Sequence, residues 1–444
     1  MKRILSLFLS AAILALCLGS CEKYDREHTL KIYNWADYID EDLLDEFVDW
    51  YEELTGERIK IIYQLFDINE VMLSKIEMGH DDYDVVCPSD YIIERMLKSD
   101  LLQPIERDFG DAPDYIDENV SPFIKGLFDR MNASGKNAND YAVGYMWGTT
   151  GILYNENYVS RDEVLSWECL ANPKFAGKMF IKDAFRDVYT SLLLYCRRDE
   201  LAAGTVTVDE LNNDASAESI ALVEEYIKSF SDNVSGWEAD FGKEQMTKEK
   251  AWINLSWSGD AQWAIDEAAA VGVPLNYVMP LDGRMCWFDG WVIPKYAVNT
   301  KAASYFINFM CKPENAVRNM DFIGYVSTIA GDEVLEAMQD EEAYEPLDAT
   351  YFFGPEADSV CLSPVMYPDR SVVEGSGLMH DSGDRTQALL EMWSRVKGDN
   401  ATGFTYILII VCVILLLAGG IRKKVRQYKK KHRASRRYSH VVRR

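Results

Sequence analysis

Apolar and polar positions alternate with two different periods along the first hundred residues, a pattern typical of strands followed by amphipathic helices. Strands are expected at residues 29–33, 59–63 and 84–87. Helices are expected at residues 40–54 and 70–78, the first ending at Gly56 and the second capped by Asn69. Strands that alternate with helices indicate a parallel sheet with helices on both faces. Ligands of such sheets bind at the loops beyond the carboxyl ends of the strands.

The middle of the chain continues this pattern with longer apolar runs. Residues 141–154 are rich in aromatic residues and glycine and predict a pair of strands. Further strands are expected at residues 178–181, 253–257 and 287–293. A helix begins within residues 183–187, and acidic helices are expected at 207–230 and 243–251. The polar region from 340 to 383 is the least regular part of the pattern.

Four short segments pair an aromatic residue with a carboxylate: Trp35-Ala36-Asp37-Tyr38, Ser89-Asp90-Tyr91, Trp257-Ser258-Gly259-Asp260 and Trp287-Phe288-Asp289. An aromatic face attracts a cation by roughly 0.5–2 kcal/mol, depending on desolvation. A carboxylate adds a charge-assisted hydrogen bond to an ammonium group. Any one segment is also typical of a core aromatic beside a turn residue. Together they predict a pocket for a small organic cation with more than one amino group.

The amino-terminal residues have the pattern of an export signal. Lys2 and Arg3 precede an apolar stretch from 4 to 18. The stretch closes with Leu18-Gly19-Ser20-Cys21, which resembles the lipobox of bacterial lipoproteins. We therefore expect residues 1–21 to be a lipoprotein signal peptide, with Cys21 lipidated as the new amino terminus.

The carboxyl-terminal residues predict a membrane anchor. Residues 404–421 carry no charge, and at 1.5 Å per residue such a helix just spans a hydrocarbon core of about 30 Å. Twelve Lys and Arg residues follow in the basic tail 422–444, without an acidic residue. The positive-inside bias predicts a cytoplasmic tail, with everything before residue 404 on the other side of the membrane.

Charge and missing motifs narrow the function. Removing the tail cations, Lys2 and Arg3 from the net charge of −26 leaves −40 for the exported part, which excludes nucleic acid as a partner. No metal-ligand spacing, GxSxG elbow, Walker A loop or dinucleotide-binding turn is present. Paired carboxylates would also suit a glycoside hydrolase, but carboxylates beside several aromatics fit a cationic ligand better. We expect no catalysis, no cofactor and no metal.

Stretches of the chain match a known family in order and spacing. They are Tyr33-Asn34-Trp35-Ala36-Asp37-Tyr38, Asn69-Glu70-Val71-Met72, Tyr83-Asp84-Val85-Val86, Pro88-Ser89-Asp90-Tyr91, Tyr145-Met146-Trp147-Gly148-Thr149-Thr150, Trp257-Ser258-Gly259, Trp287-Phe288-Asp289, Ile293-Pro294 and Phe322-Ile323-Gly324-Tyr325. From Leu30 to about Lys397 the chain resembles the periplasmic spermidine/putrescine-binding proteins of bacterial ABC importers. The resemblance implies an α/β, two-lobe periplasmic binding protein fold of type II, with the ligand in the interlobe cleft.

The resemblance also implies boundaries and site residues. The solute-binding domain is expected at 22–402, with one lobe at about 28–141 and 288–334 and the other at about 142–287 and 335–400. Ligand-binding positions carried over by motif, together with two neighbouring carboxylates, are Trp35, Asp37, Tyr38, Ser89, Asp90, Tyr91, Asp183, Asp187, Trp257, Asp260, Trp287, Asp289 and Tyr325. A glutamine of the family has no clear counterpart, because the stretch Met379-His380-Asp381 aligns poorly.

These observations predict a non-catalytic polyamine receptor at the periplasmic face of the bacterial inner membrane. It would be held there by lipid and by the C-terminal helix, and it would deliver its ligand to the permease and ATPase subunits of an importer. The number of acidic positions favours spermidine over putrescine. Two alternatives remain: a membrane-anchored polyamine sensor and a receptor for another organic cation.

Overall fold

The computed structural model describes residues 25–239 and 241–398. The chain divides after Thr386 into two compact units. Nearly all the described elements belong to the first unit, and the second contributes most of α18 (Thr386–Gly398).

A parallel group of strands forms the first lobe of this unit. Its strands are β1 (Thr29–Trp35), β2 (Lys60–Phe66) and β3 (Val85–Val86), with β1 between the other two. The connecting helices are α2 (Asp42–Thr55), α3 (Asn69–Glu77) and α4 (Asp90–Lys98). Helix α2 ends at Gly56, whose φ of 74° is a left-handed conformation that glycine adopts at little cost. The predicted order of strands and helices is confirmed here.

The second lobe repeats the arrangement. Strands β7 (Val234–Glu238) and β8 (Ile253–Trp257) flank β6 (Met179–Lys182), and both pairings are parallel. The principal helices are α7 (Phe185–Cys196), α10 (Ala217–Phe230) and α12 (Ser258–Ala270).

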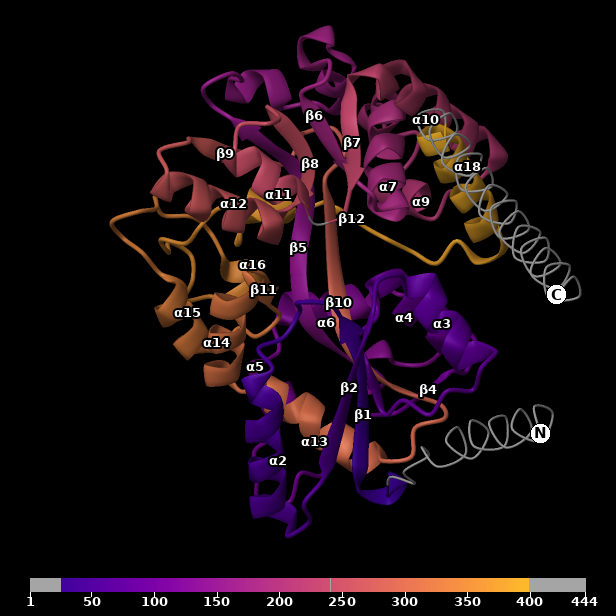
Figure 1. Cartoon of the computed structure of the whole chain (residues 1–444), viewed down its shortest axis with the longest axis vertical. Coiled ribbons are helices and arrows are strands. Elements are labelled where there is room, and N and C mark those ends of the chain that lie inside the picture. The colour runs from indigo at the N-terminus through magenta and orange to yellow at the C-terminus, as the bar shows by residue number, and fades with distance from the viewer. Residues whose placement is uncertain (1–24, 240, 399–444) are drawn as a thin grey trace, which may run out of the picture. The chain divides into compact units, whose positions relative to one another are not determined.

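Two long antiparallel strands connect the lobes (Figure 1). They are β5 (Ala142–Asn155) and β10 (Met285–Pro294), and every residue in both is buried. The prediction of a strand pair within 141–154 was wrong, because this stretch is one continuous strand. Strand β5 pairs with β10 through its first part and with β8 through its last part, so both lobes share one sheet. The predicted lobe boundaries remain a prediction.

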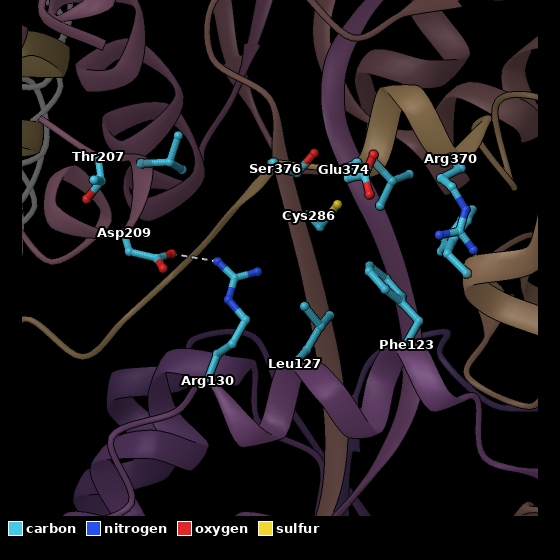
Figure 2. A pocket seen from close by; sticks show the side chains of 13 residues that line it. Phe123, Leu127, Arg130, Thr207, Asp209, Cys286, Arg370, Glu374 and Ser376 are labelled. Carbon is cyan, nitrogen blue, oxygen red and sulfur yellow. Dashed lines mark hydrogen bonds and ion pairs between the residues drawn. The ribbon is translucent and has the colours of Figure 1, made fainter. Parts of the chain in front are cut away.

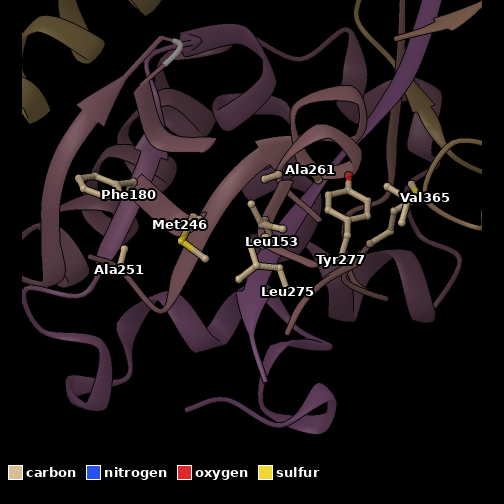
Figure 3. Packing of buried hydrophobic residues seen from close by; sticks show 11 residues of the cluster. Leu153, Phe180, Met246, Ala251, Ala261, Leu275, Tyr277 and Val365 are labelled. Carbon is tan, nitrogen blue, oxygen red and sulfur yellow. The ribbon is translucent and has the colours of Figure 1, made fainter. Parts of the chain in front are cut away.

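The second lobe has an apolar core built on small residues (Figure 3). Helix α12 places Ala261, Ala264 and Ala268 at spacings of three and four residues, which puts them on one buried face. Leu153 of β5 and Met246 of α11 (Phe241–Thr247) belong to the same cluster. Since burial of apolar surface stabilises a fold by roughly 25 cal/mol per Å², this cluster anchors α12 against β5.

Shorter elements complete the fold. The remaining strands are β4 (Leu102–Gln103), β9 (Leu275–Val278), β11 (Val326–Ser327) and β12 (Gly377–Leu378). The remaining helices are α5 (Tyr115–Asn119), α6 (Pro122–Asp129), α8 (Arg198–Ala202), α9 (Val208–Asn212), α13 (Thr300–Met310), α14 (Pro313–Ile323), α15 (Asp332–Met338), α16 (Thr350–Phe353) and α17 (Arg370–Val373).

The fold prediction needs a further correction, which concerns the C-terminal transmembrane helix. Within residues 25–239 and 241–398, no helix is long and apolar enough to cross a membrane. The predicted span at 404–421 lies outside the described residues, as do the basic tail and the signal peptide with Cys21. The transmembrane helix is therefore not part of the architecture that the structure supports.

Candidate ligand-binding site

Three carboxylates lie in the first turns of helices that follow sheet strands. Asp90 opens α4, Asp187 lies in the first turn of α7, and Asp260 lies in the first turn of α12. The partial positive charge at a helix amino terminus stabilises an ionised carboxylate. The helix ends therefore place acidic groups at one edge of the sheet, where the parallel strands end.

Asp289 connects three distant segments of the chain. It lies on β10 beside a bulge between Asp289 and Gly290. Its Oδ2 accepts a 2.8 Å hydrogen bond from the hydroxyl of Tyr38, and its Oδ1 accepts one of 2.7 Å from the hydroxyl of Ser89. Burial raises the pKa of Asp289 to about 6, although these two donors oppose the increase. The negative charge of Asp187 raises the pKa further, which shows that these two carboxylates interact.

Asp187 is held by the second lobe. Its Oδ1 accepts a hydrogen bond of 3.0 Å from the indole Nε1 of Trp257, and the hydroxyl of Thr150 lies 3.4 Å away. Burial raises the pKa of Asp187 as well. Asp187 and Asp289 are thus buried acidic groups on α7 and β10 that interact with each other.

Asp90 is the most deeply buried acidic group of the cluster, with no exposed surface. Its Oδ1 accepts a hydrogen bond from the main chain of Tyr91, and its Oδ2 has no partner among the described residues. Burial holds the pKa of Asp90 well above its ordinary value, and the charges of Asp289 and Asp187 add to the effect. An unpaired buried carboxylate oxygen is costly, and a cationic partner would satisfy it.

A row of aromatic rings lies along these carboxylates. The ring centroids of Tyr38 and Tyr325 are 5.4 Å apart, and those of Tyr325 and Trp287 are 5.8 Å apart. Trp287 in turn lies 6.2 Å from Trp257. Opposite Trp287, strand β5 carries Gly148, where an added Cβ would lie 2.7 Å from the indole. The absence of a side chain at Gly148 therefore leaves room for the Trp287 ring.

Asp260 differs from the other three carboxylates, because cations of the protein already neutralise it. Its oxygens lie 2.5 Å from Lys182 Nζ and 3.0 Å from Lys243 Nζ. Burial alone would raise the pKa of Asp260, but the two ammonium groups hold it below the ordinary value. The hydroxyl of Tyr325 donates to the same carboxylate over 2.9 Å. Asp260 therefore fixes Tyr325 in place.

Three of the predicted residues lie outside the buried cluster. Trp35, at the end of β1, is half-buried and packs on Phe66 with a centroid separation of 4.4 Å. Asp37 is exposed in a turn with a φ of 51°. Asp183 is exposed between β6 and α7, where its main-chain N–H donates to the carbonyl of Glu238.

Two residues that line the cluster were not predicted to be part of it. Asn69, expected as a helix cap, instead directs its side chain to the site: its Nδ2 donates to Ser89 Oγ over 3.0 Å and to the hydroxyl of Tyr91 over 3.2 Å. Arg186 stacks its guanidinium on the Tyr91 ring at 5.0 Å. In the sequence, Asn69 lies in a stretch that matches the family, and Arg186 directly precedes Asp187. The contacts of these two side chains cannot be predicted from those positions alone.

A separate cavity of about 420 Å³ contains none of the predicted residues (Figure 2). It is lined by α6, α9 and Cys286 of β10. Arg130, directly after α6, forms an ion pair of 2.6 Å with Asp209 of α9. Successive residues of a strand point to opposite faces. Cys286 therefore faces this cavity, while Trp287 faces the carboxylate cluster. Among the described residues, no group of His, Cys, Asp and Glu is arranged to hold a metal ion.

The chain is similar to known proteins along most of its length. The family model for bacterial extracellular solute-binding proteins matches residues 46–345. The chain is 27% identical to the spermidine/putrescine-binding periplasmic protein of Escherichia coli K12, over 86% of this chain and 96% of that protein. It is also 27% identical to the putrescine-binding periplasmic protein PotF of the same organism, over 73% of this chain and 84% of that protein.

A solved structure shares the architecture. It is described as a putative spermidine/putrescine ABC transporter from Listeria monocytogenes, is 29% identical and has a TM-score of 0.63. The likeness covers 83% of this chain and 99% of that one, which supports the predicted two-lobe α/β fold. Because the family model matches well over half of the chain, this protein belongs to the bacterial extracellular solute-binding proteins.

Proposed function

We propose that this protein is a non-catalytic periplasmic receptor that binds a polyamine and delivers it to an ABC importer. The observation that carries the proposal is the cluster of three buried carboxylates, Asp90, Asp187 and Asp289, beside a row of aromatic rings. The relatives are named for binding spermidine and putrescine, and these names support the same ligand class.

The chemistry of a polyamine suits this arrangement. At neutral pH it carries two or three ammonium groups separated by methylene chains. Each ammonium gains a charge-assisted hydrogen bond from a carboxylate, and the methylene chain packs on aromatic faces. Leaving the carboxylates buried without a cation is costly. Because the carboxylates are buried, we expect the lobes to open around β5 and β10 to admit the ligand and to close on it.

The predicted residues divide into two roles. The residues that would contact the ligand are Tyr38, Ser89, Asp187, Trp257, Trp287 and Asp289. One side of the binding site would be completed by Asp90 and Tyr91. Asp260 would hold Tyr325 rather than bind an ammonium, because Lys182 and Lys243 already neutralise it. Trp35, Asp37 and Asp183 would contribute at the entrance. The prediction that spermidine is preferred counted Asp260 and Asp183 among the available carboxylates. The relative affinity for spermidine and putrescine therefore needs its own test.

We also propose that Cys21 carries the lipid that attaches the receptor to the membrane. The proposal is based on the Leu18-Gly19-Ser20-Cys21 sequence after a basic and an apolar segment. Cells that express Cys21→Ala should incorporate no labelled fatty acid into the protein, while the original chain becomes labelled. Equal labelling of both would contradict this assignment.

Titration calorimetry of the purified protein with putrescine and spermidine tests the function directly. We expect saturable binding of at least one of the two at moderate salt. Glucose and glutamate serve as controls, because neither presents two ammonium groups. Absence of heat with both polyamines, together with binding of a sugar or an amino acid, would overturn the proposal.

A further inference from the structure

Strand β10 has different surroundings on its two faces. Trp287 and Asp289 lie on the face of the carboxylate cluster, whereas Cys286 and Phe288 lie on the opposite face, because successive residues of a strand alternate. Phe288 packs on Phe128 of α6 with a ring-centroid separation of 4.7 Å, and Cys286 lines the cavity of about 420 Å³ (Figure 2). We call the side of the carboxylate cluster the front and the side of this cavity the rear. The candidate ligand site and the rear cavity therefore lie on opposite faces of one strand.

The walls of the rear cavity come from different lobes. Helix α6 belongs to the first lobe, because its Phe128 and Ile93 of α4 lie 3.5 and 3.0 Å from the same Cβ position, at Gly290. Helix α9 packs against α7 of the second lobe. Leu127 of α6 lines one wall of the cavity, and Val208 of α9 lines the other. The width of the cavity therefore depends on the angle between the lobes.

The front cleft is closed in this structure. Arg186 of α7 lies over the ring of Tyr91 on α4 at 5.0 Å, which joins the second lobe to the first across the cleft. Arg186 also donates to the carbonyl of His380, whose Nδ1 lies 2.8 Å from Glu94 Oε2 on α4. The closed front and the rear cavity are thus features of the same conformation.

Hinge motion connects the front with the rear. The long strands β5 and β10 run from one lobe to the other, so the lobes rotate about this pair of strands. Because each lobe moves as a rigid body and the hinge lies between front and rear, a rotation that separates α4 from α7 brings α6 toward α9. Opening the front cleft therefore narrows the rear cavity, and closing the cleft widens it again.

The lining of the rear cavity suits this movement. Phe123, Leu127 and Val208 are apolar and can slide past one another without breaking hydrogen bonds, whereas a closely packed interface would resist compression. The ion pair between Arg130 and Asp209 is 2.6 Å long, with 36% and 65% of the two side chains exposed. Water can replace either partner of such an exposed pair at little cost. The charged rim therefore does not prevent the walls from approaching each other.

We propose that the rear cavity is the clearance that allows the front cleft to open, so that a group filling this cavity holds the receptor closed on its ligand. The proposal goes beyond polyamine binding, because it concerns how any ligand of the front cleft is released. A filled cavity destabilises the open form and so raises the population of the closed form. Ligand affinity rises with the population of the form that binds the ligand.

A cavity-filling variant tests the proposal without any ligand. Val208→Trp places an indole in the rear cavity, and Val271→Trp is the matched control, because Val271 is 69% exposed at the end of α12. Spin labels on Ile68→Cys and Phe241→Cys report the opening of the front, since these exposed residues follow the carboxyl ends of β2 and β7 in different lobes. The half-buried Cys196 and Cys361 are replaced by serine in every sample.

In the ligand-free, full-length protein, Val208→Trp should shift the front distance distribution toward shorter values, whereas Val271→Trp should leave it unchanged. An unchanged distribution in Val208→Trp would overturn the proposal. With putrescine, release from Val208→Trp should be about tenfold slower than from the original protein, as overpacking of the open form implies. Release at the original rate would also overturn it. Stopped-flow displacement of the bound ligand measures this rate.

A second pair of labels follows the rear in the original protein. Arg130→Cys and Asp209→Cys place one label on each wall, in exchange for an ion pair that is largely exposed. Putrescine should lengthen this rear distance while it shortens the front distance. A shorter front without a longer rear would overturn the proposal, even if Val208→Trp does not fold. Absence of binding by both putrescine and spermidine would instead overturn the proposed function, and the ligand-free comparison would still decide the role of the cavity.

Discussion

The hydroxyl of Tyr38 donates a hydrogen bond of 2.8 Å to Oδ2 of Asp289, although 251 positions separate the two residues. Ser89 donates to the other oxygen of the same carboxylate, from a third part of the chain. These bonds attach the loops after β1 and β3 to strand β10, one of the two strands that connect the lobes. A cation bound by Asp289 would therefore lie close to both the first lobe and the connecting strands.

Asp289→Asn should weaken polyamine binding by roughly 10- to 100-fold, because a hydrogen bond to a charged group contributes about 1.5–3 kcal/mol. The amide keeps the size of the side chain but removes the charge. Asp266→Asn is the control, since it removes the same charge from an exposed position of α12. Dissociation constants from calorimetry measure the effect. Near-original affinity in Asp289→Asn would mean that the ligand binds elsewhere.

The pKa of Asp289 predicts how binding depends on pH. Burial raises it from 3.8 to about 6, so in the ligand-free protein this carboxyl is protonated below that pH. A cationic ligand favours the ionised form. Affinity should therefore fall as pH decreases through 6, and binding near pH 5 should release a proton. Calorimetry in two buffers with different ionisation enthalpies measures the release.

The same pKa predicts the stability of the ligand-free protein. A carboxyl whose pKa is raised on folding holds its proton more tightly in the folded chain, so its contribution to stability is complete below pH 3.8 and is lost as pH rises to about 6. Asp90 and Asp187, which face Asp289 and also have raised pKa values, act in the same direction. Asp289→Asn should reduce the pH dependence of the melting temperature over this range, and an unchanged profile would contradict the assignment.

Trp257 should contribute to polyamine affinity in two separable ways. Trp257→Phe keeps an aromatic face but removes the donor to Asp187, whereas Trp257→Ala removes both. We expect a modest loss of polyamine affinity in the first variant and a larger one in the second. Equal affinity of both variants and the original protein would show that the ring of Trp257 lies outside the binding site.

Local patterns in the sequence predicted most strands and helices of the first lobe. They succeeded because periodicity and a terminal glycine such as Gly56 act within one element. The pairing of aromatic residues with acidic ones also indicated the cluster around Asp289, because those residues lie at strand ends and a parallel sheet brings strand ends together.

Long-range partners explain what the sequence could not predict. The charge of Asp260 is visible in the sequence, but its neutralisation depends on Lys182, 78 positions away. Likewise, Asn69 has the sequence features of a helix cap, and only the fold shows that it bonds Ser89 instead. The continuity of β5 depends on its two different partners, β10 and β8, which no local period reveals.

Gly148→Ala should disturb the aromatic row. The new Cβ would lie 2.6 Å from Ser258 Oγ and 2.7 Å from the Trp287 ring, so the indole must move. We expect lower polyamine affinity and a lower melting temperature. Gly126→Ala is the matched control, because nothing lies within 4 Å of its Cβ position on α6, and there alanine should be neutral or stabilise by about 0.5–1 kcal/mol. Similar behaviour of both variants would contradict the tight contact at Gly148.

Lys182→Met should destabilise the second lobe more than an ordinary lysine substitution. Lys182 is fully buried, and its Nζ lies 2.5 Å from Asp260 and 3.3 Å from Glu238. Methionine fills a similar volume but leaves these two carboxylates with too little positive charge. Removing one partner of a buried ion pair costs about 3–5 kcal/mol.

Lys248→Met provides the comparison for this last experiment, because Lys248 pairs with Glu244 on the exposed surface at 3.1 Å. Such a surface pair contributes about 0–1 kcal/mol. Denaturant unfolding of the two variants should therefore show a much lower midpoint for Lys182→Met. Adding Glu238→Gln to Lys182→Met should recover part of the loss, since it removes one uncompensated charge. If both lysine variants unfold at the same denaturant concentration, the buried ion pairs of Lys182 do not stabilise the lobe.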